Sequence, residues 1–369
     1  MGKVCLFLIN GLGMGNSTRC HAVIQQLRAR GAEIHVLTSG NGLRFFADKP
    51  EIASLTPMDA FFYSGSEGRI SGLRTLLRLG DLARLARRKT RQLEALLRTI
   101  EPDVAVLDSE YAVGPLRRRG VPIVGLNNSD VVVSSYFQGI RSRSIRNHFW
   151  IFEYMDYLLH KRICTLVISP SPTAVPPRHS KIRRVGLIVR QELEPLCRER
   201  RGDAFPAPRD CRRFLFMLSG SIFASAIPLE AARFPFNIDV IGRDGTDREG
   251  VAFHGRQMHN LEFLRQADAL VVNGGFCAVS EAIALNRPAF VIPVKGHAEQ
   301  FVNAALLQRL GHGFAVSDET VLDRIGACLR DNAWTGLAPK QPDLGFDGAR
   351  EAAEHILGLP GRTGGAGAG

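Results

Sequence analysis

A glycine-rich loop near the start of the chain has the composition of a cradle for an anion or a sugar. It directly follows the apolar run Val4–Ile9, and glycine recurs in it at every second position, at Gly11, Gly13 and Gly15. Glycine lets the backbone approach a ligand closely, and the amides of a helix that follows would point at that ligand. The dinucleotide spacing G-x-G-x-x-G is not met, because Asn16 and Thr18 stand where its last glycine is required. A tight strand-to-helix turn without a ligand is the alternative interpretation.

A second pair of glycines, Gly274 and Gly275, follows the predicted strand Ala269–Val272 and opens a predicted helix. Amides at the start of a helix attract a diphosphate, whose negative charge the helix dipole favours. Glu281 lies more than one helical turn further on, where its carboxylate can accept hydrogen bonds from ribose hydroxyls. These residues together predict a site for a nucleoside diphosphate.

The loop after the next predicted strand, Ala289–Pro293, carries a carboxylate beside an amide. These are Glu299 and Gln300, and Asn303 follows about one helical turn later. Such side chains suit a ligand with several adjacent hydroxyls, as a sugar has. A polar helix cap is the alternative interpretation of either loop taken alone.

Two carboxylates, Asp108 and Glu110, follow the predicted strand Val104–Leu107, and Asn127 follows the neighbouring predicted strand. Ligand sites of parallel sheets gather at the carboxyl ends of the strands. A carboxylate placed there can accept the proton of a reacting hydroxyl. Roles in a turn and a helix cap are the alternative.

The elements that must position these loops alternate between short apolar runs and longer helical stretches, which predicts an α/β fold with parallel sheets. The first series of predicted strands is Val4–Ile9, Ile34–Leu37, Val104–Leu107, Ile123–Leu126 and Leu166–Ser169. The second is Phe214–Leu218, Ile238–Gly242, Ala252–His254, Ala269–Val272 and Ala289–Pro293. The predicted helices are Thr18–Arg30, a basic one within 73–100, Leu261–Gln266, Cys277–Leu285, Glu299–Leu310 and Val321–Asp331.

A proline-rich and charged connection separates the two series of elements. We therefore expect one domain over residues 1–185, a second over 186–357, and a disordered Gly/Ala tail over 358–369.

The composition is that of a globular protein with an anionic partner. The 369 residues include 47 Lys and Arg against 36 Asp and Glu, for a net charge of +11 and a pI near 9.7. Hydrophobic residues at 45% and charged residues at 22% exclude disorder, collagen and coiled coil as the main architecture. The seven cysteines are scattered and include no C-x-x-C pair, so we expect reduced thiols and a cytoplasmic protein.

A basic segment, residues 69–98, combines nine Lys and Arg with two acidic residues and a stripe of leucines. It could rest on an anionic membrane at the inner face or guide a phosphorylated acceptor. The solvated face of a packed helix is the alternative. Nucleic acid is not expected as a partner, because no aromatic interleaving or known binding motif accompanies the charge.

The second glycine pair and its surroundings resemble the donor signature of the GT-B nucleotide-sugar glycosyltransferases. The resemblance rests on Gly274-Gly275 through Glu281, then Pro288, Pro293, His297, Glu299-Gln300, Asn303 and Gly311. It is closest to family 28, the MurG-like type, and to the macrolide glycosyltransferases. The amino-terminal loop is similar to a branch of the same superfamily, which extends the likeness over most of the chain.

The resemblance implies two Rossmann-like domains facing across a cleft, with the acceptor on the first and a nucleoside diphosphate sugar, UDP-linked, on the second. The implied acceptor residues are Gly11, Gly13, Gly15, Asn16 and Asn127. The implied donor residues are Gly220, Ser221, Met258, Gly274, Gly275, Phe276, Cys277, Ala278, Glu281, His297, Glu299, Gln300 and Asn303. Transfer with inversion and without metal or cofactor is implied, because helix amides neutralise the leaving diphosphate.

The sequence departs from this family where many members carry a histidine base, since Asn16 stands there and cannot take up a proton. We therefore expect Asp108 or Glu110 to act as the base. His21 is a further candidate, but it is equally consistent with a helix histidine that takes no part in catalysis. Asn286 replaces a frequent glycine, which we expect at a left-handed helix end. Two other functions stay open: a nonhydrolysing UDP-sugar 2-epimerase, and a catalytically silent nucleotide-sugar binding subunit.

Overall fold

The computed structural model describes residues 2–59, 65–66, 69–70, 79–200, 202–218, 227–229, 234–257 and 259–361. Gly220, Ser221, Met258, most of the predicted carboxy-terminal tail and part of the basic segment therefore lie outside the described residues. No helix in these ranges is both long and apolar enough to cross a membrane.

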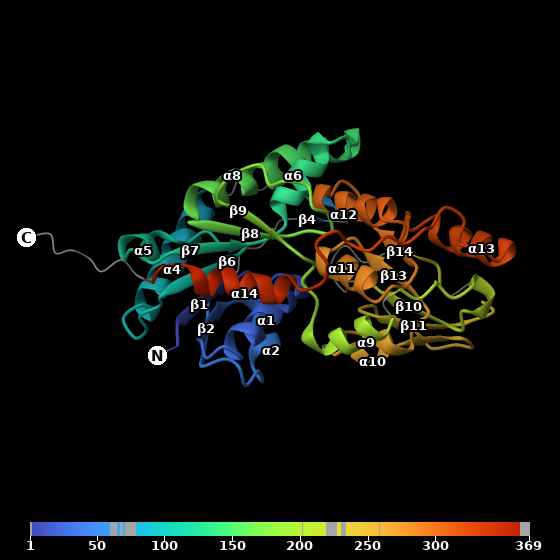
Figure 1. The fold of residues 1–369 in the computed structure, drawn as a ribbon, viewed down its shortest axis with the longest axis horizontal. Helices are drawn as coiled ribbons and strands as arrows, with labels where there is room; N and C mark the ends of the chain where they lie inside the picture. The colour runs from blue at the N-terminus through green and yellow to red at the C-terminus, as the bar shows by residue number, and fades with distance from the viewer. Residues whose placement is uncertain are drawn as a thin grey trace, which may run out of the picture.

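The first domain is built on a parallel sheet in the order β3-β2-β1-β6-β7-β8-β9 (Figure 1). Its strands are β1 (Val4–Ile9), β2 (Glu33–Thr38), β3 (Ser54–Pro57), β6 (Val104–Asp108), β7 (Ile123–Leu126), β8 (Leu166–Pro170) and β9 (Ile182–Val185). A short antiparallel pair, β4 (Gly65–Ser66) and β5 (Arg69–Ile70), stands apart from it. The central strands are apolar and buried on both faces, as helices covering a parallel sheet require.

The second domain has its own parallel sheet, in the order β12-β11-β10-β13-β14-β15. Its strands are β10 (Arg213–Met217), β11 (Asn237–Ile241), β12 (Val251–Phe253), β13 (Ala269–Asn273), β14 (Ala289–Ile292) and β15 (Gly313–Ala315). Each sheet has one buried apolar cluster on each of its faces. The expected pair of Rossmann-like α/β domains is confirmed.

The helices flank the two sheets. In the first half they are α1 (Met14–Arg28), α2 (Gly40–Phe46), α4 (Leu79–Leu96), α5 (Gly114–Arg118), α6 (Ser129–Phe137), α7 (Arg146–His148) and α8 (Tyr154–Ile163). In the second half they are α9 (Glu194–Glu199), α10 (Leu261–Gln266), α11 (Phe276–Ala284), α12 (Ala298–Arg309), α13 (Val321–Asp331) and α14 (Gly348–Gly358). A π-helical turn, Phe149–Glu153, joins α7 to α8.

The last helix returns to the first domain. Figure 1 shows α14 lying beside α1, and Ala349, Ala352 and Ile356 belong to a core cluster of the first sheet. The sequence placed all of 186–357 in the second domain. This helix instead buries its apolar face against α1, where the Ala side chains allow close packing.

The chain crosses between the domains twice, and the two crossing segments are hydrogen-bonded side by side. Leu187 N donates to Gly345 O at 2.9 Å, and Gly348 N donates to Leu187 O at 3.3 Å. A Cβ on Gly348 would lie 1.9 Å from Gly186 O, so only glycine permits this approach.

The basic segment is only partly visible, but its described part is a packed helix. In α4, Leu93 is fully buried and Lys89 points inward, while Arg84, Arg87 and Arg91 are exposed. Leu93 and Leu97 belong to the first core cluster, so the packed-helix alternative accounts for these two side chains, and the membrane contact of 69–98 stays a prediction. Asn286 has φ 49°, the left-handed helix end expected for it.

Candidate active site

The first glycine loop follows β1, and its glycines serve different purposes. A Cβ on Gly11 would lie 1.6 Å from Ser39 O, so Gly11 is required by packing. Gly13 is the N-cap of α1 and has open space around its Cα. The sequence placed the helix start at Thr18, but α1 begins at Met14, so Gly15 and Asn16 lie in its first turn.

The loop between β13 and α11 shows the same division between its two glycines. A Cβ on Gly274 would lie 2.7 Å from Gln300 O, whereas a Cβ on Gly275 would meet nothing within 4 Å. Gly275 is the N-cap of α11, and no side chain caps the helix there. Phe276 packs into the core, so only its backbone can face a ligand. The first-turn amides of α11 thus open onto the free space beside Gly275.

The loop between β14 and α12 lies directly beside this one. Asn303 Nδ2 donates to Gly274 O at 3.0 Å, and Gln300 Oε1 accepts from Val294 N at 3.0 Å. His297 is the N-cap of α12. The two donor loops predicted from the sequence therefore form one continuous surface.

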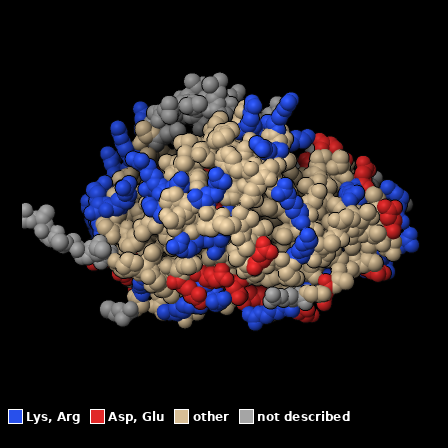
Figure 2. All heavy atoms as spheres, turned by 45° about the horizontal axis from the view of Figure 1, so that its top comes forward, with Lys and Arg blue, Asp and Glu red and all other residues tan. Residues whose placement is uncertain are grey.

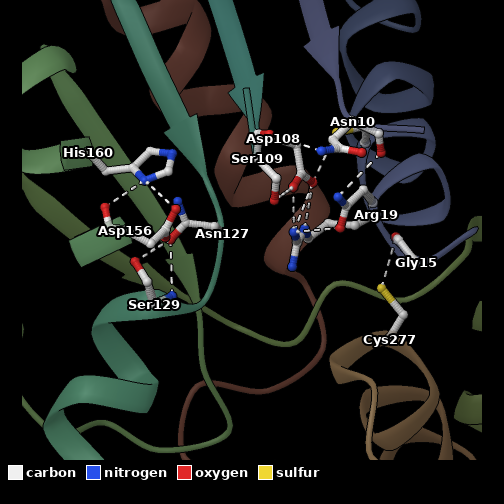
Figure 3. A network of polar contacts seen from close by, with 12 residues as sticks. Asn10, Gly15, Arg19, Asp108, Ser109, Asn127, Ser129, Asp156, His160 and Cys277 are labelled. Carbon is white, nitrogen blue, oxygen red and sulfur yellow. Dashed lines mark hydrogen bonds and ion pairs between the residues drawn. The ribbon is translucent and has the colours of Figure 1, made fainter. Parts of the chain in front are cut away.

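The loops of the two domains meet across a narrow seam (Figure 3). Cys277 points from α11 toward α1, and its Sγ donates to Gly15 O at 3.1 Å. Burial raises the pKa of Cys277 to about 12, so the group is a thiol at neutral pH. Asn128 Nδ2 donates to Asn303 Oδ1 at 3.5 Å in the same seam. The structure thus brings the predicted acceptor and donor residues together.

Asp108 is fully buried and is held by a cation. Arg19 binds it with Nε at 3.0 Å and Nη2 at 2.7 Å, and both side chains are nearly inaccessible (Figure 3). Cys20 and Ser109 also donate to this carboxylate. A carboxylate engaged by a guanidinium fork is a positioning group, because its lone pairs are already occupied.

Glu110 is held in the same way by a different helix. Lys89 of α4 donates to its two oxygens at 2.8 and 2.9 Å. Ser109, between the two carboxylates, has φ 56°, so the chain turns sharply and directs Asp108 toward α1 and Glu110 toward α4. Burial raises the pKa of Glu110. The two predicted bases therefore do not converge on one point.

Asn127 lies at the end of β7 beside a buried carboxylate–imidazole pair. Its Oδ1 accepts from Ser129 Oγ at 2.7 Å, while its buried Nδ2 has no partner among the described residues. Asp156 faces His160 Nδ1 at 3.2 Å. Burial opposes the charged imidazole, but Asp156 outweighs it and the pKa of His160 is raised. The unpaired Nδ2 of Asn127 is a polar group that an acceptor could satisfy.

Glu281, expected to face a ribose, is bound by an arginine that the sequence analysis missed. Arg190 binds its carboxylate with Nε at 2.6 Å and Nη2 at 2.9 Å. Arg190 follows the first crossing between the domains, so the two residues are far apart in the chain. Sequence spacing carries no signal for such a pair.

Glu299 lies where the two domains face each other, near a cluster of titratable groups from the first domain. Its pKa is raised by burial, although Arg19, Asn128 and Asn303 act against this rise. The nearby Glu153 also has a pKa raised by burial and by the charge of Glu299. No Lys or Arg of the described ranges forms an ion pair with either carboxylate.

His148, Glu153 and His297 offer ligand atoms within 4.8 Å of one another, a set that could hold a metal ion. These side chains already accept hydrogen bonds from the first turn of α12. His148 Nδ1 accepts from Ala298 N at 3.4 Å, and His297 Nδ1 accepts from Gln300 N at 3.5 Å. Glu153 accepts from the Glu299 amide. His148 and Glu153 of the first domain thus add to the cap that His297 provides for α12, and their distance along the chain from α12 hid this contact from sequence analysis.

His21 is a satisfied helix histidine. It is buried against Phe45 and Phe46, with Nε2 3.5 Å from Glu51. Burial lowers its pKa. Asn16, by contrast, is half-buried beside Arg19, with Oδ1 accepting from Nη2 at 3.5 Å.

Solved structures similar to this one include two glycosyltransferases. MurG of Acinetobacter baumannii matches with a TM-score of 0.58 at 15% identity, over 97% of this chain and all of that one. The calicheamicin glycosyltransferase matches with a TM-score of 0.55 at 20% identity, over 97% of this chain and 99% of that one. At these identities the likeness concerns the fold, which is GT-B.

Curated relatives include two uncharacterized glycosyltransferases of archaea. The protein of Methanosarcina mazei is 24% identical over 364 residues, 89% of each chain. That of Methanosarcina acetivorans is 25% identical over 363 residues, 89% of this chain and 87% of its own. The family model described as glycosyl transferase family 1 matches residues 3–145 and 228–331, parts of both domains. The chain therefore belongs to this family and is a glycosyltransferase of GT-B fold.

Proposed function

We propose that the protein transfers a sugar from a nucleoside diphosphate sugar, UDP-linked, to an acceptor bound by the first domain, with inversion and without a metal. The observation that carries this proposal is the uncapped start of α11, where Gly275 leaves open space opposite the glycine loop of the other domain. Amides at that point would neutralise the leaving diphosphate. Among solved structures of this fold, a Streptomyces glycosyltransferase was crystallised with thymidine diphosphate and VinC with dTDP, which supports a diphosphate ligand.

The test is thermal unfolding with UDP and EDTA together. A nucleotide that binds only the native state adds RT ln(1 + [L]/Kd), about 2.7 kcal/mol at a hundredfold excess over Kd. UDP should raise Tm without any divalent cation, and UDP-sugar with candidate acceptors should then give transfer. Binding that strictly requires a metal would contradict the proposal. Isomerisation of the donor alone would indicate the epimerase, and binding without turnover the silent subunit.

For the proton acceptor we assign Glu299, in place of Asp108 or Glu110. The last two are held by Arg19 and Lys89, whereas Glu299 lies at the seam, beside Asn128 and Asn303. Burial raises its pKa, and a carboxylate with a raised pKa is a better base near neutral pH.

The pH profile separates this base from a residue that only binds the sugar. Glu299→Gln should lower kcat by about 100- to 10,000-fold and remove the acidic limb, while UDP affinity changes little. Gln300→Ala should also lower kcat, by about 10- to 1,000-fold, but should keep the acidic limb. If the acidic limb of the kcat pH profile persisted in Glu299→Gln but disappeared in Asp108→Asn, Asp108 would be the proton acceptor instead.

A further inference from the structure

Five of the large apolar side chains that the structure leaves exposed lie on one stretch of the first domain, from the end of α6 to α8. They are Phe137 (41% exposed), Trp150 (44%), Ile151 (54%), Met155 (47%) and Leu159 (39%). Ile151, Met155 and Leu159 recur every four residues, so they share one side of the helical stretch. We call these five residues the apolar face.

The opposite side of the same stretch is firmly packed. Phe149 is fully buried and stacks on Tyr136 with ring centroids 3.6 Å apart, and Tyr157 is buried as well. Phe137 and Trp150 contact each other edge to face at 6.1 Å. The apolar face therefore lies on the solvent side of a well-packed helical stretch. Its side chains are not exposed because a helix end has frayed.

Four exposed arginines lie in the same stretch of chain as the apolar face, and the guanidinium of a fifth, Arg178, lies 4.8 Å from the centroid of the Phe137 ring. The four are Arg141, Arg143, Arg146 and Arg162. Residues 137–163 contain five Lys and Arg against Glu153 and Asp156, and these two carboxylates turn inward to His148 and His160. Figure 2 turns the top of Figure 1, where α6 and α8 lie, toward the viewer. Basic side chains are numerous there, whereas acidic ones gather at the lower edge and over the second domain.

We propose that the apolar face and its arginines form a docking surface for an anionic lipid bilayer. Trp and other aromatic side chains prefer the headgroup level, aliphatic ones enter the acyl boundary, and each arginine near an anionic surface adds attraction. A second copy of the chain fits less well. A two-fold interface over this face would bring the arginines of both copies together without carboxylates to pair them.

The docking surface is continuous with the seam between the domains. His148 and Glu153 lie on the same stretch of chain and cap the first turn of α12, next to Glu299. A bilayer bound to the apolar face would therefore lie close to the site. This position of the membrane, together with the proposed function on which the inference rests, indicates that the acceptor is an amphiphile. Its polar head would reach the seam while its tail stays in the membrane.

Tryptophan fluorescence reports the docking directly, because the chain has only two tryptophans, Trp150 and Trp334. In a Trp334→Phe chain, all tryptophan emission comes from the apolar face. Vesicles of phosphatidylcholine with phosphatidylglycerol should shift this emission to the blue, and brominated lipid should quench it. Pure phosphatidylcholine vesicles should act much more weakly, and added salt should weaken the response.

Matched variants separate the apolar and the charged contributions in a vesicle sedimentation assay. Ile151→Ser/Met155→Ser should lower partitioning by at least about tenfold, since buried methylene groups contribute most of the binding. Arg143→Gln/Arg146→Gln should lower it by about fivefold for each arginine, on anionic vesicles only. Arg198→Gln/Arg350→Gln removes two exposed arginines of α9 and α14 and should change nothing.

Two results would overturn the proposal. The first is that Ile151→Ser/Met155→Ser partitions onto vesicles as well as the parent chain does. The second is that the parent chain sediments as a dimer, that Ile151→Ser/Met155→Ser is a monomer, and that neither protein binds vesicles. The vesicle assays need no donor and no turnover. Loss of UDP binding in solution would contradict the proposed function and leave the membrane surface standing. If the protein bound vesicles but turned over lipid-tailed acceptors no faster than short-chain ones, the docking surface would be supported and the proposed amphiphilic acceptor would be contradicted.

Discussion

At the level of single residues, the adjacent glycines 274 and 275 show how packing and binding can be told apart. A side chain at Gly274 would collide with Gln300, but one at Gly275 would enter open space, and Gly275 has the ordinary φ of −64°. We expect Gly275→Ala to fold with unchanged Tm and to bind UDP at least about tenfold more weakly, because the methyl group displaces the diphosphate from the amides. Titration of UDP measures this.

Gly358→Ala is the matched control for that prediction. Gly358 also has nothing within 4 Å of an added Cβ, but it ends α14, away from the seam. Its UDP affinity should equal that of the parent chain. If Gly275→Ala bound UDP as tightly as the parent chain, the diphosphate would not bind at the start of α11.

The Arg190–Glu281 pair allows a structural role to be separated from ribose binding. Removing Glu281 alone leaves a largely buried guanidinium unpaired, which costs about 3 to 5 kcal/mol. The double change Arg190→Leu/Glu281→Leu removes both charges and should restore most of the stability. If Glu281 also holds the ribose, this stable double variant should still bind UDP about tenfold or more weakly. Restored stability together with full UDP affinity would limit the pair to a structural role.

At the level of elements, α14 supports the helix that carries the first glycine loop. Ile356 is fully buried in the cluster that also contains Val23 and Leu27 of α1. Ile356→Ala should lower the free energy of unfolding by about 2 to 5 kcal/mol in urea titration, through the lost transfer energy and the cavity. His355→Ala, half-buried on the same helix, should cost much less. Equal losses would mean that α14 is not anchored through its apolar side.

The regular elements were predictable where their signal is local. The central strands β1, β6, β7 and β13 are continuous apolar runs, and the sequence places each of them within one residue of its bounds. The edge strands β3 and β9 were missed because they are short and mixed in polarity, and β15 was missed because it has only three residues. Helix α14 was missed because its core side is mostly alanine, which gives a weak hydrophobic pattern.

The site was predictable as loops but not as contacts. Glycine spacing and the polar residues after each strand located the seam, since carboxyl ends of parallel strands share one edge of the sheet. The ion pairs of Asp108, Glu110 and Glu281 join residues that are far apart in the chain, and the pairing partner of a carboxylate leaves no local pattern. The likeness to known glycosyltransferases implied the ligand classes, but not which carboxylates are already neutralised.

At the level of the whole molecule, two sheets present their carboxyl edges to each other, and α12 of the second domain also buries Ala298, Val302 and Leu306 in an apolar cluster of the first domain. Cys277 to Gly15, Asn128 to Asn303, and His148 to Ala298 each join the domains by one hydrogen bond. The apolar contact of α12 restricts relative motion of the domains, whereas the loops of the seam are joined only by these single hydrogen bonds. A ligand that bridges both loops would add contacts to each side and stabilise the seam.

The double crossing near Gly186 and Gly348 has a consequence for a chain that is cut. The piece after residue 185 would still carry α14, whose apolar side packs on α1, and its Gly186 amide donates to Glu351 within that same piece. Peptides 1–185 and 186–369 made separately should therefore recognise each other and rebuild the seam without a covalent link. The path of the backbone and the packing of α14 on α1 therefore predict a split form of the enzyme that assembles from two polypeptides.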